Sequence, residues 1–294
     1  MVPSPLESAR DLVSSSTELP TIPEIVLRIV GKLNDEDVFI DDIIPLVLQD
    51  QVLTGRVLRL VNSALYSPLE PVSSVREAFI YLGLERLKEA IFTCAIIDLF
   101  KSGTGTFNRS TLWTHALGVA IIARAIATSV GGPDPSDAYV AGLLHDVGEV
   151  FFSYYLKDDF VRVSNTVAAD NTTFLDEEYH QFGTSHCEVG YFIGERWRFD
   201  PPVTNAILFH HSPESAPPEH AAMVAIVAIA NLYATLRRLG YGNPRPTRDD
   251  LYSFGAWQTL QQALPDAVVS PQAIINELDS SITKIQSAID ATFL

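Results

Sequence analysis

The sequence has few cysteines, no long apolar run and no leader pattern. Cys94 and Cys187 are its two cysteines, too few for a disulfide framework or a zinc site built on cysteines, and they indicate reduced thiols. The longest apolar run, Ala221–Ala230, ends at Asn231, well short of the roughly 20 residues that a membrane span needs. The N-terminus shows no basic stretch followed by an apolar segment, the pattern of a secretory signal. We therefore expect a cytoplasmic protein without a membrane partner.

Basic residues are also scarce. Lysine and arginine number 20 against 36 aspartates and glutamates, which gives a formal net charge of -16. A charge of this sign repels phosphate backbones at long range. We therefore expect no nucleic-acid partner.

Strand-like alternation is nearly absent, whereas apolar residues recur at helical spacing along most of the chain. The hydrophobic content of 47% supports a substantial core. We predict an all-α fold, with a small N-terminal helical domain over residues 1–105 and a helical bundle over residues 106–294. The glycine-, serine- and threonine-rich stretch from Lys101 to Ser110 marks the boundary.

The predicted helices follow from this periodicity. Apolar spacing predicts one helix over residues 22–33, two within residues 41–67, and two that meet near Gly83. In "RVLRLVNSALYS" we expect Asn62 to end a helix by bonding to backbone. In the second domain the predicted helices lie near 111–129, 136–156, 158–170, 174–181, 185–197, 202–211 and 219–239.

The C-terminal stretch predicts one further helix. Ser270 is its expected N-cap and Pro271 its first residue. An apolar stripe follows, made of Ile275, Leu278, Ile282, Ile285 and Ile289. We expect the stripe to pack onto its own chain; a short dimerising seam, and hence a homodimer, is the alternative.

Five of the seven histidines fall on apolar faces of predicted helices. Those five are His115, His145, His186, His210 and His211, and Asp146 accompanies them in "GLLHDVGEVFF". A lone buried histidine usually bonds to a backbone carbonyl. Five are harder to explain in this way, because each unsatisfied buried group costs about 1–3 kcal/mol, whereas a divalent cation would satisfy them together. His180 and His220 stand in polar surroundings and are expected at the surface.

The pattern therefore predicts a metal site made of His115, His145, Asp146, His186, His210 and His211. Imidazoles with a carboxylate suit iron, manganese, zinc or nickel, and Asp146 can bridge two ions. We expect one or two divalent ions. Asp146 is also the one candidate for a catalytic residue.

An ordered set of motifs resembles a known family. The set is "LPTIPEIVLRIV", "VLRLVNSALYS", "SSVREAFIYLG", "LWTHALGVA", "AGLLHDVGEVFF", "GTSHCEVGYFIGERW" and "AILFHHSPE", over about residues 18–240. The chain resembles the HDOD branch, the HD-related output domains of bacterial signalling proteins, within the HD superfamily of metal-dependent phosphohydrolases. The resemblance implies an HD-domain-like bundle and a role in signal transduction. It also matches the six predicted ligands to the metal ligands of active HD-GYP relatives.

Three positions depart from those active relatives. The resemblance implies a glutamate where Thr111 stands, a final aspartate where Asn231 stands, and a lysine where Glu149 stands. Asn231 removes an anionic ligand, and Glu149 repels a substrate phosphate. We therefore expect a site that holds metal without turning over substrate.

Three hypotheses follow from these residues. The favoured one is a non-catalytic regulatory module that transmits a state to a protein partner in a signalling pathway. The alternative is an active phosphohydrolase of the phosphodiesterase or nucleotidase kind, which uses the same histidines and aspartate. The third is a sensor in which a bound metal or nucleotide ligand sets the arrangement of the domains.

Overall fold

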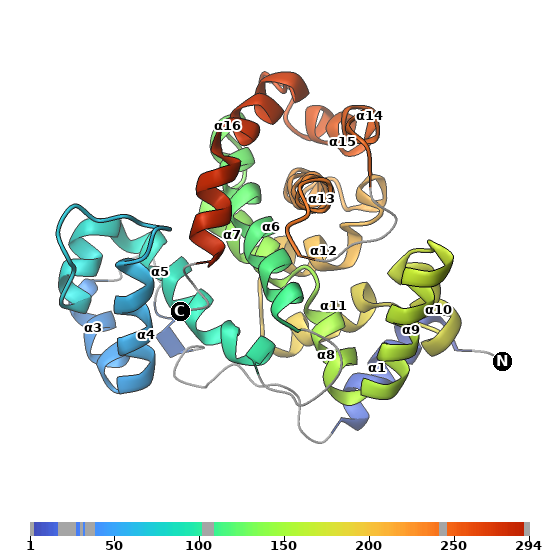
Figure 1. The fold of residues 1–294 in the computed structure, drawn as a ribbon, viewed down its shortest axis with the longest axis horizontal. Coiled ribbons are helices and arrows are strands. Elements are labelled where there is room, and N and C mark those ends of the chain that lie inside the picture. The colour runs from blue at the N-terminus through green and yellow to red at the C-terminus, as the bar shows by residue number, and fades with distance from the viewer. Residues whose placement is uncertain are drawn as a thin grey trace. The chain divides into compact units, whose positions relative to one another are not determined.

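The computed structural model describes residues 3–16, 28–29, 32, 39–101, 109–240 and 246–290. Within these ranges the chain forms helices and no strands, so the predicted all-α fold is confirmed (Figure 1). Most of the predicted helix over residues 22–33 lies outside the described residues.

The chain divides into two compact units. Unit 1 comprises residues 1–20 and 100–278, and unit 2 comprises residues 21–99 and 279–294. Helix α1 (Pro5–Ser15) belongs to unit 1 because it packs against α11 (His186–Arg196). The predicted domains were residues 1–105 and 106–294. The units differ from them at the two chain ends, because residues 1–20 belong to unit 1 and residues 279–294 to unit 2. The domain boundary stays a prediction.

Unit 2 contains the helices α3 (Ile40–Leu48), α4 (Gln51–Val61) and most of α5 (Val75–Lys101). Asn62 ends α4 as predicted: its side chain donates to the carbonyls of Leu58 and Val72 and accepts from the Val72 N–H, each at 2.8 Å. The two helices predicted to meet near Gly83 are the halves of α5. They are separated by a backbone at φ 75°, ψ 179°, which in practice only glycine adopts.

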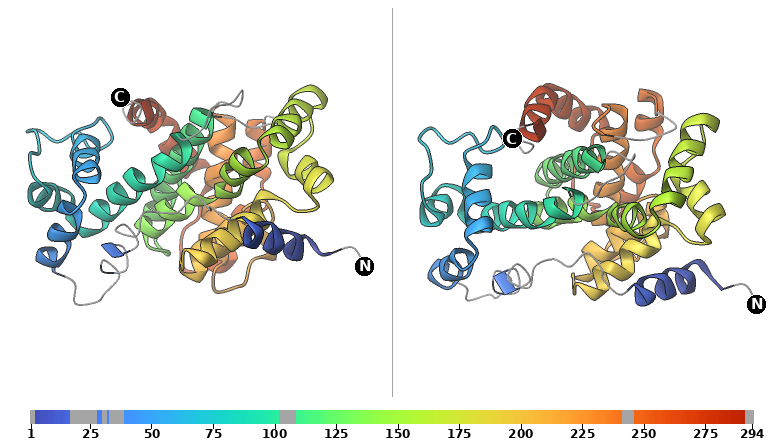
Figure 2. Two further views of the ribbon diagram at one scale, coloured as in Figure 1. Left: turned by 90° about the horizontal axis from the view of Figure 1, so that it is seen from below. Right: turned by 60° about the horizontal axis from the view of Figure 1, so that its bottom comes forward.

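Unit 1 is built around α6 (Arg109–Val130) and α13 (Ala221–Leu236), which pack against each other and against α7 (Pro135–Leu144). Figure 2 shows α6 and α7 side by side in both views. Within the described residues, Ser110–Val130 has the length and composition of a membrane span, but 72% of it is buried, as in a core helix.

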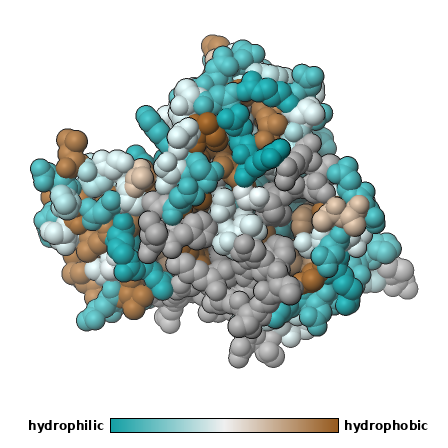
Figure 3. All heavy atoms as spheres, viewed as in Figure 1, coloured by the Kyte–Doolittle hydropathy of each residue, from teal (hydrophilic) through white to brown (hydrophobic). Residues whose placement is uncertain are grey.

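The remaining helices of unit 1 surround this centre. They are α8 (Val147–Tyr155), α9 (Lys157–Asp170), α10 (Phe174–Phe182), α11, α12 (Pro201–Phe209), α14 (Arg248–Ser253) and α15 (Ala256–Ala263). Sequence periodicity missed α1, α14 and α15, which are short. On the face shown in Figure 3, polar side chains cover most of the coloured surface and apolar ones form smaller patches.

The C-terminal helix α16 (Pro271–Asp290) begins as predicted, since the Ser270 hydroxyl accepts the Ala273 N–H at 3.4 Å. Four members of its apolar stripe are buried in the single chain: Ile275, Leu278, Ile285 and Ile289. Most of the stripe is therefore buried within its own chain, as predicted. The homodimer stays a prediction.

Candidate metal centre

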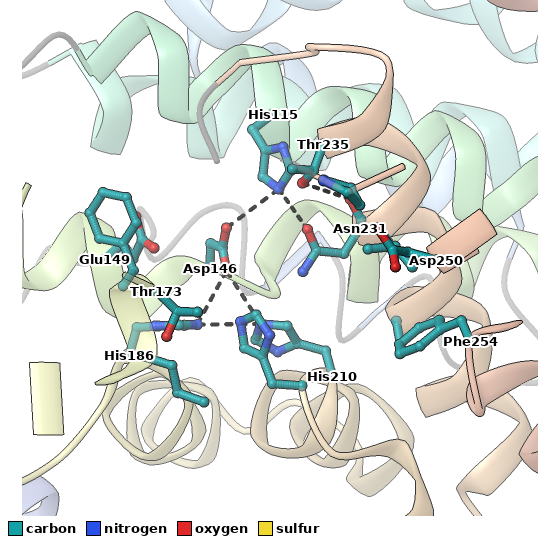
Figure 4. Close-up of a pocket in the computed structure, with 16 residues that line it drawn as sticks. His115, Asp146, Glu149, Thr173, His186, His210, Asn231, Thr235, Asp250 and Phe254 are labelled. Carbon is teal, nitrogen blue, oxygen red and sulfur yellow. Dashed lines mark hydrogen bonds and ion pairs between the residues drawn. The ribbon is translucent and has the colours of Figure 1, made fainter. Parts of the chain in front are cut away.

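Six predicted site residues come together in unit 1 from four places in the chain. His115 comes from α6, the pair His145–Asp146 from the junction of α7 and α8, His186 from the start of α11, and the pair His210–His211 from the end of α12. Figure 4 labels His115, Asp146, His186 and His210 of this set. His115, His145, His186 and His210 are at most 3% exposed. His211 is exposed, but it lines the pocket, and its ligand atom lies within 4.8 Å of those of His186 and His210.

The junction of α7 and α8 corrects the single helix predicted over residues 136–156. The helix stops at Leu144, and Asp146 takes φ -103°, ψ 21° before α8 begins. Asp146 is the N-cap of α8, but its side chain makes no capping bond. The break therefore turns the Asp146 carboxylate toward the histidines, and this is why the HD pair lies between two helices.

Glycine allows the site helices to approach closely. A Cβ atom on Gly148 of α8 would lie 2.0 Å from the His186 carbonyl oxygen, so α8 and α11 touch through their backbones. Gly240, at φ +90°, lies against α6, where a Cβ atom would be 2.7 Å from that of His115. These contacts bring the backbone beside the imidazole rings.

Each of the four buried histidines has its Nδ1 atom fixed by an acceptor. Three of these acceptors are backbone carbonyl oxygens and the fourth is a carboxylate oxygen. In every case Nδ1 is therefore the donor. The pairs are His115 with Leu239 O (2.9 Å), His145 with Gly142 O (2.7 Å), His210 with Ile207 O (2.8 Å) and His186 with Glu178 Oε2 (2.6 Å). All four rings are thereby oriented with Nε2 toward the site.

The four Nε2 atoms surround the Asp146 carboxylate. His145 and His115 lie 3.1 and 3.7 Å from Oδ2. His210 and His186 lie 3.4 and 3.6 Å from Oδ1. Each carboxylate oxygen thus faces two imidazoles, which is the arrangement that a carboxylate bridging two ions would require.

The Asp146 carboxyl is ionised. Burial alone would raise its pKa, but the neighbouring imidazoles, His145 first, hold the pKa well below its usual range. The negative charge is therefore present where the four Nε2 atoms converge.

His186 and His210 face each other through their Nε2 atoms, which are 3.3 Å apart. Burial lowers the pKa of His210 to about 4. Burial also opposes charge on His186, but Cys187 and Glu178 outweigh it and raise the pKa of His186 well above its ordinary value. His186 is therefore the ring that carries a hydrogen on Nε2, and the neutral His210 accepts it through its own Nε2.

His115 is in a different state, because the side-chain amide of Asn231 lies 2.9 Å from its Nε2 atom. Burial lowers the pKa of His115 and keeps the ring neutral. Because Nδ1 carries the hydrogen of this neutral ring, Nε2 accepts, and the donor is the NH2 group of the Asn231 amide. The amide therefore occupies the one nitrogen through which His115 could bind a metal.

The site opens into a cavity of about 610 Å³. His115, Asp146, His186, His210 and His211 are among its lining residues. Its other lining residues are Glu149, Thr173, Phe174, Leu175, Ala228, Asn231, Leu232, Thr235, Pro246, Asp250 and Phe254. No lysine or arginine is among these residues of the described chain.

Sequence reasoning missed two neighbours of the cluster. Glu178 is fully buried and accepts both the backbone N–H (2.8 Å) and Nδ1 of His186. Its position in the polar stretch "LDEEYH" gave no signal, because the adjacent Glu177 has the same chemistry. Cys187, interpreted as an ordinary thiol, places Sγ within 4.8 Å of ligand atoms of His186, His210 and His211.

Of the two histidines predicted at the surface, His180 is exposed and His220 is partly buried. Neither lines the cavity.

The helical fold and the convergence of an HD pair with three further histidines define a protein of the HD superfamily type. Residues 19–213 match the HDOD domain model, so the chain belongs to the HDOD family and the resemblance is confirmed. An HDOD domain protein of unknown function from Geobacter sulfurreducens is 50% identical, with a TM-score of 0.92 over 99% of this chain and 98% of that chain.

More distant relatives are longer proteins. An uncharacterized Treponema pallidum protein is 30% identical over 258 residues, which is 86% of this chain and 49% of that protein. Ribonuclease Y of Wolinella succinogenes is 33% identical over 125 residues, 42% of this chain and 18% of that enzyme. The chain spans about half the length of the first and less than a fifth of the second.

Proposed function

We propose that this protein is a non-catalytic regulatory module that carries a divalent metal site. The observation that supports this proposal best is the set of four Nε2 atoms around the Asp146 carboxylate, with every Nδ1 atom already used. Nδ1 atoms bound to carbonyl or carboxylate acceptors are the usual second shell of histidine metal ligands. Membership of the HDOD family supports the regulatory role.

The residues present fit a metal. Asp146 would bridge a position on the side of His115 and His145 and a position on the side of His186 and His210, the latter completed by His211. A metal on the second side would replace the proton of His186, since ligand imidazoles must be neutral. The donor set suits iron, manganese, zinc or nickel, and such an ion supplies Lewis-acid chemistry when bound.

Two features argue against turnover. Asn231 bonds His115 and offers a neutral amide where a carboxylate would hold an ion. The cavity lining described above contains no lysine or arginine, whereas phosphoryl transfer needs positive charge facing the phosphate. The site is therefore better suited to hold an ion than to use it.

The test combines metal analysis with an activity screen. We expect purified protein, exposed to each of the four metals and dialysed, to retain metal by elemental analysis. We also expect no turnover of a panel of phosphomonoesters, nucleotides and cyclic dinucleotides. Turnover at ordinary enzymatic rates that disappears in Asp146→Ala would overturn the proposal.

That result would establish the second candidate function, a metal-dependent phosphohydrolase. The convergence of the histidines and Asp146 beside a cavity favours it. In that case the Asp146→Ala variant should keep its helical content and lose activity.

The proposed partners follow from the same features. We propose a protein partner in a signalling pathway and a cytoplasmic location. The cavity of about 610 Å³ lies in the size range of small-molecule sites and suits a nucleotide ligand. The net charge of -16 argues against a nucleic-acid partner.

A further inference from the structure

Glu149 lies among the metal-site residues. It stands in the first turn of α8, three residues after Asp146, and is 2% exposed. Its carboxylate and ligand atoms of Asp146 and His186 all lie within 4.8 Å of one another. In the view of Figure 4, Glu149 and Asn231 lie on opposite sides of Asp146.

This placement brings two buried carboxylates close together. Two like charges so close in a buried site repel each other, and a cation between them removes the repulsion. The position of Glu149 is also fixed, because Gly148 packs against the His186 backbone. The backbone of Glu149 is therefore held beside α11.

We propose that Glu149 is an anionic ligand of the metal position on the His186 side of Asp146. This inference rests on the proposed metal site and assigns one more ligand to it. The donor set on this side becomes the carboxylates of Asp146 and Glu149 with the imidazoles of His186, His210 and His211. Asn231 leaves the His115 side without a second anionic ligand. Glu149 supplies one on the opposite side of Asp146, beside His186.

The distribution of charge predicts which position fills first. The His186 side has two carboxylates, whereas the His115 side has one and its histidine is bonded to Asn231. Carboxylate ligands favour manganese and iron, and anionic oxygen binds these ions more strongly than an amide oxygen does. We expect the first ion to bind on the Glu149 side.

The test compares Glu149→Gln with the wild-type chain by calorimetric titration with manganese and by metal content after dialysis. Glutamine keeps the shape and removes the charge, and we expect the Kd to rise at least tenfold. Glu195→Gln, which removes an exposed carboxylate from α11, is the matched control and should bind as wild type does. If Glu149→Gln loses helical content, the pair Glu149→Asp and Glu149→Asn makes the same comparison, with tighter binding expected for Asp.

The outcomes separate this inference from the proposed function. If wild type binds metal and the neutral variants bind it equally tightly, Glu149 is not a ligand although the metal site stands. If wild type binds none of the four metals, the metal site fails and the assignment of Glu149 fails with it.

Discussion

Asn231 sets the charge on the His115 side of the site. Its amide lies 2.9 Å from His115 Nε2, in the position where the resemblance implies an aspartate. We expect Asn231→Asp to add one bound ion per chain, because the new carboxylate supplies the missing anionic ligand beside His115. Elemental analysis after dialysis measures the stoichiometry.

The control is Asn276→Asp on α16, which adds the same charge at an exposed site and keeps the acceptor for Gln272. It should leave the metal content unchanged. An Asn231→Asp protein with wild-type stoichiometry would show that charge does not limit binding on the His115 side.

Glu178 controls the orientation of one ring. Its Oε2 atom accepts Nδ1 of His186 at 2.6 Å and directs Nε2 into the site. We expect Glu178→Gln to weaken metal binding about 10- to 100-fold, the usual effect of losing such a second-shell carboxylate. Calorimetric titration measures this change, and Glu177→Gln on the same helix, which should bind normally, is its control. Equal affinity in the two variants would contradict the role of Glu178.

At the scale of elements, the crossing of α8 and α11 depends on Gly148. An added methyl group would lie 2.0 Å from the His186 carbonyl oxygen, which belongs to backbone and cannot move aside. We expect Gly148→Ala to lower the free energy of unfolding by about 3 kcal/mol. Denaturant unfolding followed by circular dichroism measures this.

Gly55 is the matched control, because it lies inside α4 with nothing within 4 Å of an added Cβ atom. Gly55→Ala should be neutral or stabilise by up to about 1 kcal/mol, since alanine favours helix. Equal stability of the two variants would mean that α8 and α11 separate easily.

Gly83 sets the geometry within α5. Its φ of 75° with ψ of 179° strains any other residue although the surrounding space is open. We expect Gly83→Ala to lower the free energy of unfolding by about 1–3 kcal/mol, which thermal unfolding measures as a lower midpoint temperature. The control is Gly255→Ala, which should leave the midpoint unchanged because Gly255 has a negative φ and open space around it. A Gly83→Ala protein as stable as wild type would show that α5 tolerates a continuous helix.

Periodicity and caps predicted much of this architecture. The helix α11 was predictable because Ser185 and Glu188 form the capping box that the sequence shows. The break between α7 and α8 was not, because apolar residues stand on both sides of the HD pair in "GLLHDVGEVFF" and nothing local marks a helix end. The acceptors of His115 and His210 are backbone carbonyls, which carry no sequence signal at all.

The site itself was predictable in composition more than in geometry. Helical spacing placed the buried face of His115 correctly, whereas the exposure of His211 depends on where α12 ends. The contact of Glu149 with His186 depends on packing between helices that are far apart in sequence. A sequence pattern defines one helix at a time and gives no information on such distances.

At the scale of the whole molecule, all the predicted ligands lie in unit 1, while α4 and most of α5 belong to unit 2. A regulatory module must convert an event in its site into a change elsewhere, and a ligand does so only if it binds two states with different affinity. We expect manganese to slow amide hydrogen exchange in α6, α8, α11 and α12 and also to change it in α4 or α5. Mass spectrometry of metal-loaded and chelator-treated protein measures this.

Asp146→Ala is the control, because without the central carboxylate the added metal should leave exchange unchanged in both units. Slower amide hydrogen exchange in the site helices α6, α8, α11 and α12 alone would contradict the regulatory proposal. It would show that the ion stabilises unit 1 by mass action alone, by about 2.7 kcal/mol at a hundredfold excess over Kd, without reaching unit 2. The metal would then be structural, and the regulatory proposal would lose its means of transmitting a signal, because a ligand without differential effect on a second region shifts no equilibrium there.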